Sequence, residues 1–112
     1  MTRIIFHRDG EGQIACVDLQ GHAGFADAGE DIVCAAITSA VQLTHVLLED
    51  VWKLAFDTEA DQEGTHIRLS FPLSARERAQ SALEALRIHY SELQENYADF
   101  IQVMEVHSHA EN

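Results

Sequence analysis

The first twenty residues of the chain form two apolar segments with a polar turn between them. Residues 3–8 are rich in strand-forming side chains, and residues 13–20 carry an apolar side chain at every second position, which is the period of a β-strand. The segment between them, residues 9–12 (DGEG), is typical of a turn. We therefore expect a β-hairpin. Residues 21–29 contain three glycines and show no periodicity, which predicts a loop.

From residue 31 to about residue 52 the pattern has the period of an α-helix. No Gly or Pro interrupts it, and apolar or small side chains recur at steps of three and four. The stripe consists of Val33, Ala36, Ile37, Ala40, Thr44, Leu47, Leu48 and Val51. We expect burial on more than one side of this helix, because further apolar residues widen the stripe: Ile32, Ala35, Leu43 and Val46.

The second half of the chain predicts two strands, a helix and a last strand. Residues 53–58 and 66–71 have strand character around a turn at residues 61–64, and Pro72 ends the second of them. Ser74 followed by Glu77 predicts a capping box at a helix start. The core stripe of that helix is Ala79, Leu83, Leu86, Tyr90, Leu93 and Tyr97. Residues 100–106 predict a strand, and residues 107–112 a frayed tail.

The predicted order ββαββαβ indicates an α+β fold in one domain over residues 1–112. Because hairpins imply antiparallel pairs, we expect a two-layer structure, with two helices on one face of a mainly antiparallel sheet. The other face must then be polar or buried against a second copy. Ile14 and Cys16 are candidates for exposure on that face, which makes a homodimer plausible.

The charge balance narrows the classes of partner. Seven Lys and Arg stand against 19 Asp and Glu, a formal net charge of -12, so direct binding to a nucleic-acid backbone is not expected. No apolar run approaches a membrane span, and no helix has a basic face for a membrane surface. Charged residues interrupt every apolar run at the amino terminus, so we expect a cytoplasmic protein with free thiols. The acidity favours solubility or a basic partner.

Cys34 is the candidate for chemistry. With Asp31 as the N-cap, Cys34 would be the third residue of the helix, where free N–H groups and the helix dipole stabilise a thiolate. The glycine-rich loop carries His22, whose imidazole could fold back to the sulfur and form a Cys-His dyad. Thr38 lies one turn further and could offer its hydroxyl to the thiolate, while the helix N–H groups could bind an oxyanion. The nearby anions Glu30 and Asp31 oppose the thiolate.

Periodicity and spacing alone leave other roles open for these residues. A cysteine in such an apolar run is most often a small core residue, and Cys16 lies in a strand, where a structural role is expected. A zinc site of Cys16, Cys34, His22 and a further histidine is disfavoured, because no CxxC or HxxxH pair is present. We therefore expect no metal and no cofactor. The remaining histidines have no evident catalytic role: His45 lies three turns from Cys34, His66 and His89 have no evident partner, and His107 and His109 lie in the tail.

The segment around these two residues resembles a known family. Gly21-His22-Ala23, followed by residues 28–36 (AGEDIVCAA), is similar in order and spacing to the signature of the ribosomal-processing cysteine proteases, the Prp or YsxB-like family. That signature is a GHA tripeptide and then G-x-D-I-V-C-A-[AG]-[VI]-S. Thr38 departs from it, since the family usually has Ser there; the hydroxyl is kept and a methyl group is added.

The resemblance implies a cytoplasmic, homodimeric cysteine endopeptidase without a metal. Members of the family remove an N-terminal extension from ribosomal protein bL-twenty-seven of the large subunit. It implies Cys34 as the nucleophile, His22 as the general base and acid, and Gly21 and Asp31 as residues that shape the loop and the helix start. Residues 24–29 (GFADAG) would be a mobile loop over the cleft, and an apolar pocket would lie beside the cysteine. The alternative is a noncatalytic module that binds a basic ribosomal protein through its acidic surface.

Overall fold

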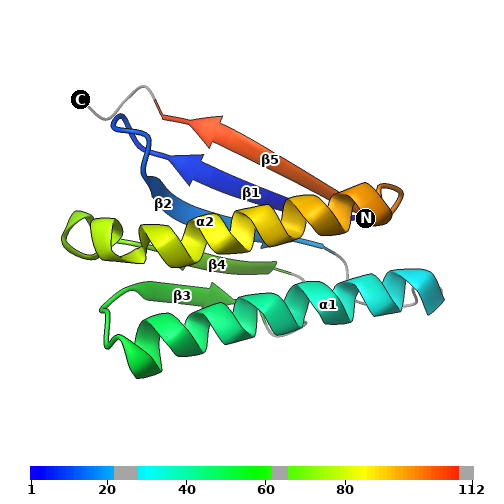
Figure 1. The fold of residues 1–112 in the computed structure, drawn as a ribbon, viewed down its shortest axis with the longest axis horizontal. Coiled ribbons are helices and arrows are strands. Elements are labelled where there is room, and N and C mark those ends of the chain that lie inside the picture. Colours follow the sequence, from blue (N-terminus) through cyan, green and yellow to red (C-terminus); the bar gives the residue numbers. More distant parts are fainter. Residues whose placement is uncertain (22–27, 62–65, 109–112) are drawn as a thin grey trace.

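Five strands form one sheet in the order β3-β4-β2-β1-β5, and the helices lie on one side of it (Figure 1). The computed structural model describes residues 1–21, 28–61 and 66–108. The strands are β1 (Thr2–Arg8), β2 (Ile14–Gln20), β3 (Asp57–Ala60), β4 (His66–Ser70) and β5 (Ile101–His107). The helices are α1 (Ala28–His45), which continues as the π-helical turn η1 (Val46–Val51), and α2 (Leu73–Asn96). Only the pairing of β1 with β5 is parallel among the strand pairs of these residues. The predicted α+β fold is confirmed.

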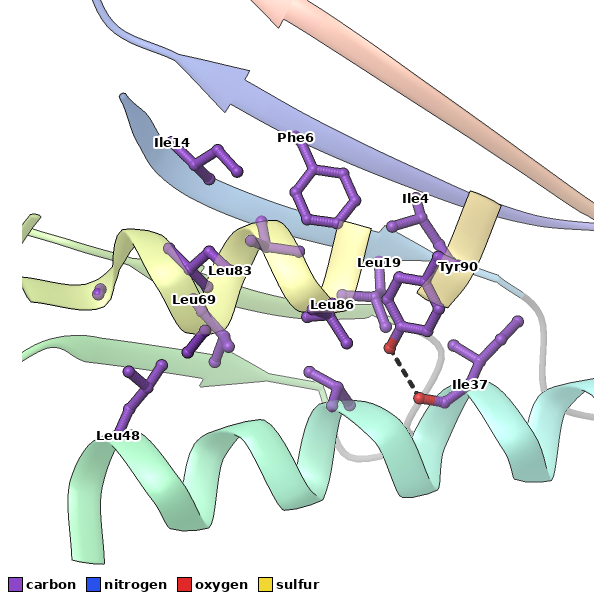
Figure 2. Packing of buried hydrophobic residues seen from close by; sticks show 14 of the residues in the cluster. Ile4, Phe6, Ile14, Leu19, Ile37, Leu48, Leu69, Leu83, Leu86 and Tyr90 are labelled. Atoms are coloured by element: carbon purple, nitrogen blue, oxygen red, sulfur yellow. Dashed lines mark hydrogen bonds between the residues drawn. The ribbon is translucent and has the colours of Figure 1, made fainter. Parts of the chain in front are cut away.

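The hydrophobic core fills the space between the sheet and the two helices. Figure 2 shows its centre, where Tyr90 of α2 is fully buried beside Ile37 of α1. The Tyr90 hydroxyl donates a hydrogen bond of 2.8 Å to the Ile37 carbonyl oxygen, so it ties the helices together. Burial raises the pKa of Tyr90, which keeps this hydroxyl protonated as a donor. The sheet contributes Ile4, Phe6, Ile14, Val17, Leu19, Leu69 and Ile101 to this core.

A β-bulge changes which side chains of β2 face the core. Opposite β1, the register moves from His7↔Cys16 to Arg8↔Ile14, so Ala15 is the extra residue. Ile14 therefore joins the core with 0% exposure, and Cys16 is also buried, at 8%. The prediction that Ile14 and Cys16 are exposed on the uncovered face is thus wrong. Ile14 turns into the core because strict alternation does not hold across a bulge, whereas Cys16 is covered by Arg68, whose Nε donates to its Sγ.

The hairpin turn is fixed to α2 by a buried carboxylate. Asp9 Oδ1 accepts the backbone N–H groups of Glu11 and Gln13 at 2.9 and 3.0 Å, and Asp9 Oδ2 accepts Arg76 Nη1 at 2.9 Å. Burial alone would raise the pKa of the Asp9 carboxyl, but the hydrogen bonds from Arg76, Gln13 and Glu11 outweigh it and lower this pKa. Gln80 adds two hydrogen bonds to the backbone of Ile14.

Several predicted boundaries are wrong. No side-chain cap bond precedes α2; Pro72 occupies its N-cap position, so the capping box of Ser74 and Glu77 is not formed. Residues 53–56 are not a strand, because the chain reverses at Lys53 (φ 57°) and the Leu54 N–H bonds to the Leu48 carbonyl. His107 belongs to β5 rather than to a frayed tail, while His109 lies outside the described residues.

One side of α1 and of the turn η1 leaves apolar side chains in solvent. Ile32 is 62% exposed, Leu43 71% and Val46 45%, so the helix is not buried on more than one side. Between α1 and α2 lies an apolar groove of about 560 Å³, whose lining includes Leu43, Leu47 and Leu86. By length and composition alone, the stretch Ile32–Val51, with a mean hydropathy of 1.6, is apolar enough to cross a membrane, although polar and charged residues interrupt its apolar runs. Its inner face nevertheless packs into the core, through Val33, Ile37, Val41 and Leu48.

Candidate active site

Cys34 lies in the N-terminal part of α1, next to the start of β1. It is half-buried, and its Sγ is 3.9 Å from Oγ1 of Thr2. Thr2 is 6% exposed, and its backbone N–H donates to the Phe100 carbonyl at 2.9 Å. The nucleophile candidate therefore contacts a hydroxyl whose backbone is fixed by the sheet.

Gly21 packs against the same threonine. A Cβ at this position would lie 2.8 Å from Thr2 Oγ1, which is closer than real Cβ atoms approach, and 3.1 Å from Thr2 Cγ2. The absence of a side chain at Gly21 thus lets the end of β2 pass directly over Thr2. His22, the predicted base, is the next residue and lies outside the described residues. Of the site residues predicted from the sequence, Gly21 and Cys34 both lie against Thr2.

The helix begins earlier than predicted, which changes the surroundings of Cys34. Because α1 starts at Ala28, Asp31 is its fourth residue and not the N-cap, and Cys34 is the seventh. The free N–H groups at a helix start belong to the first four residues, and the dipole acts mainly within the first turn. Cys34 therefore gains less from the helix end than the predicted third position would give. The last two residues of the predicted mobile loop, Ala28 and Gly29, are helical.

The sequence patterns do not indicate the contact between Thr2 and Cys34. Thr38, the predicted source of a hydroxyl, is exposed on α1, and the hydroxyl found at Cys34 Sγ is that of Thr2. Thr2 and Cys34 are 32 positions apart in the sequence, and Thr2 is the first residue of a strand with an ordinary pattern. Since only the packing of α1 against the end of β1 joins them, no periodicity or spacing signal could have found the pair.

The other cysteine lies in a different environment. Cys16 is in β2, where Arg68 Nε donates to its Sγ at 3.2 Å. On the same sheet, His66 hydrogen-bonds to Asp18, so the expectation that His66 has no partner is wrong. His45 Nε2 is 2.9 Å from Thr58 Oγ1, at the far end of α1. Within residues 1–21, 28–61 and 66–108, no three His, Cys, Asp or Glu side chains are arranged to hold a metal ion.

The helix groove does not coincide with the candidate nucleophile. Its lining residues on α1 begin at Ala36 and do not include Cys34. The apolar pocket expected beside Cys34 is therefore not this groove.

The family model described as cysteine protease Prp matches residues 1–102. The chain belongs to the Prp family of cysteine proteases. It is 28% identical over 109 residues to the ribosomal processing cysteine protease Prp of Bacillus subtilis, covering 92% of this chain and 96% of that protein. By enzyme class, the protein is thus a cysteine protease of the ribosomal-processing family, as the resemblance of the Gly21–Cys34 region predicts.

Solved structures share the fold over nearly the whole chain. The Streptococcus mutans protein SMU.848 is 25% identical, with a TM-score of 0.86 over 96% of this chain and 99% of that one. The essential ribosomal processing protease Prp from S. aureus, in complex with a substrate peptide, is 21% identical, with a TM-score of 0.85 over 94% and 99% of the two chains. The two-layer arrangement is therefore the Prp fold.

Proposed function

We propose that this protein is a cytoplasmic endopeptidase that removes the N-terminal extension of ribosomal protein bL-twenty-seven. In this proposal Cys34 is the nucleophile and His22 the general base and acid. The observation that carries it is the packing of Cys34 against Thr2, which in turn contacts Gly21, the residue directly before His22. The likeness to a protein named for ribosomal processing supports the choice of substrate.

The proposed reaction is an acyl transfer through a thioester. His22 accepts the thiol proton, the Cys34 sulfur attacks the scissile carbonyl, and the protonated His22 gives its proton to the leaving amine. Water, deprotonated by His22, then hydrolyses the thioester and frees the sulfur. Helical side chains lean towards the N-terminus, so the Cys34 sulfur is expected on the side of the first turn of α1. The N–H groups of that turn, of residues 28–31, are the proposed oxyanion donors.

The surroundings of the two cysteines favour Cys34 as the nucleophile. The sequence contains only two cysteines. Cys16 is buried in a central strand of the sheet at 8% exposure, whereas Cys34 is half-buried on a helix at the surface of the domain. The greater exposure of Cys34 favours it as the cysteine that a peptide substrate contacts.

The proposal is tested with the same organism's bL-twenty-seven carrying its N-terminal extension. Incubation with the protein should give one cleavage, identified by the masses of the two products. Absence of cleavage, together with a Cys34 thiol that is inert to iodoacetamide until denaturation, would instead favour the noncatalytic acidic binding module.

We expect the cleavage rate to fall as salt rises. The formal net charge of the protein is -12, and a ribosomal protein is basic, so their attraction raises the encounter rate at low ionic strength. Between 0.05 and 0.5 M salt, screening should lower kcat/KM by about tenfold while leaving kcat nearly unchanged. A kcat/KM independent of salt would show that the acidity serves solubility alone.

We also propose that two copies associate through the apolar side of α1. Leu43, 71% exposed, lines the apolar groove between the helices, and Val46 is 45% exposed in the turn that continues α1. Exposed apolar side chains of this kind are typical of an interface. Leu43→Glu should therefore shift the protein from dimer to monomer in sedimentation velocity. Gln102→Glu, on the exposed side of β5, adds the same charge elsewhere and should leave the dimer intact. A monomeric parent protein would contradict the proposal.

A further inference from the structure

Thr2 joins three segments that the proposed mechanism needs. Its backbone N–H donates to the carbonyl of Phe100, immediately before β5, and its side chain packs on Gly21. Its hydroxyl oxygen is 3.9 Å from Cys34 Sγ. The residue is 6% exposed, so bulk water does not compete freely for this hydroxyl. A buried threonine hydroxyl requires a polar partner, and the sulfur is the partner that the structure places beside it.

The chemistry of the two groups fixes the direction of this hydrogen bond in the reactive state. A hydroxyl can donate or accept, whereas a thiolate has no proton and can only accept. Once the base has removed the thiol proton, Thr2 Oγ1–H must therefore be the donor. Hydrogen bonds to a charged partner are about twice as strong as neutral ones. The distance of 3.9 Å is long, as contacts at catalytic groups often are before substrate binds.

We propose that Thr2 is a further residue of the active site, whose hydroxyl stabilises the Cys34 thiolate. The same side chain packs against Gly21, and His22, which carries the imidazole, is the next residue in the sequence. The inference rests on the proposed role of Cys34 as nucleophile. Thr2 is thus a second source of thiolate stabilisation beside the helix start. The helix start contributes less than predicted, because Cys34 is the seventh residue of α1.

Two substitutions separate the hydroxyl from the shape of Thr2. Thr2→Val keeps the branched shape that packs on Gly21 and removes the hydroxyl, whereas Thr2→Ser keeps the hydroxyl and removes the methyl group. The rate of Cys34 alkylation by iodoacetamide is measured from pH 5 to 10 in the full-length protein, and mass spectrometry confirms the alkylated residue. Thermal unfolding of each variant shows whether the fold is kept.

For Thr2→Val we expect alkylation at pH 7 to slow by about tenfold, with the rise of rate moved to higher pH. Thr2→Ser should stay within about twofold of the parent. A Thr2→Val profile that coincides with the parent's overturns the inference, and so does a Thr2→Ser variant that is as slow as Thr2→Val, because the methyl packing would then be the cause.

The outcome can be separated from the fate of the proposed function. Alkylation needs no peptide substrate, so a protein that fails to cut bL-twenty-seven still reports whether Thr2 acts on the Cys34 sulfur. Conversely, a protein that cuts this substrate but shows no hydroxyl effect retains the proposed function and loses the inference.

Discussion

Replacing Cys34 with alanine is expected to lower the rate of cleavage of extension-bearing bL-twenty-seven by about 10⁴-fold or more. The substitution removes the proposed nucleophile, and without its sulfur no thioester can form. The residue is half-buried and on a helix, where alanine is a good helix former, so the thermal unfolding temperature should change little. Product formation is followed by mass spectrometry under single-turnover conditions.

The chain supplies a matched control in its other cysteine. Cys16→Ala removes a sulfur from β2 and a hydrogen bond from Arg68, so it should lower stability modestly but leave cleavage within about threefold of the parent. His22→Ala should slow cleavage by about 10³-fold, since general-base help is lost. An active Cys34→Ala protein, or an inactive but folded Cys16→Ala protein, would contradict the assignment of the nucleophile.

The largest effect on stability is expected at Asp9. Asp9→Ala should lower the free energy of unfolding by about 3 kcal/mol, because it removes the acceptor of two turn N–H groups and leaves the Arg76 guanidinium without this buried carboxylate. Urea unfolding followed by circular dichroism measures the change. Glu11→Ala, at an exposed position of the same turn, should change the free energy by less than about 0.5 kcal/mol. Equal effects of the two substitutions would show that the turn is not fixed through Asp9.

The same carboxylate predicts a pH dependence. Its pKa is lowered in the folded protein, so its contribution to stability is fully present above the pKa in the unfolded chain, about 3.9. The contribution is lost as pH falls through the lower pKa of the folded state. The difference in free energy of unfolding between the parent and Asp9→Asn should therefore be constant from pH 7 to about pH 5 and shrink below about pH 4. A difference that persists undiminished at pH 2 would show that ionisation of Asp9 is not its source.

Most of the element order could be predicted from the sequence because local patterns determine it. The alternation around Val17 and Leu19 predicted β2, and the steps of three and four from Val33 to Leu48 predicted the first helix. Cys34 could be singled out because a local motif links it to His22 and Gly21. The structure places Gly21 near Cys34 through Thr2, and the role of His22 stays a prediction.

The remaining features depend on contacts between distant segments. Ile14 enters the core only because a bulge forms against β1, and α1 starts three residues before Asp31 within a glycine-containing segment that local signals indicate as a loop. The capping box failed because Pro72 is the N-cap of α2, two residues before the N-cap position predicted for Ser74. Thr2 was missed for the same reason as Ile14: its role comes from packing between segments far apart in sequence.

The parallel pairing of β1 with β5 determines when the site can exist during synthesis. The hairpin of β1 and β2 needs only the first twenty residues, but Thr2 is held from its other side by Phe100 and pairs with Ile101. Until residues 100–107 have left the ribosome, β1 is an unprotected edge and its end beside Cys34 is not anchored. A nascent chain that stops before β5 therefore lacks this anchor beside Cys34, so the centre can assemble only after residues 100–107 have been synthesised.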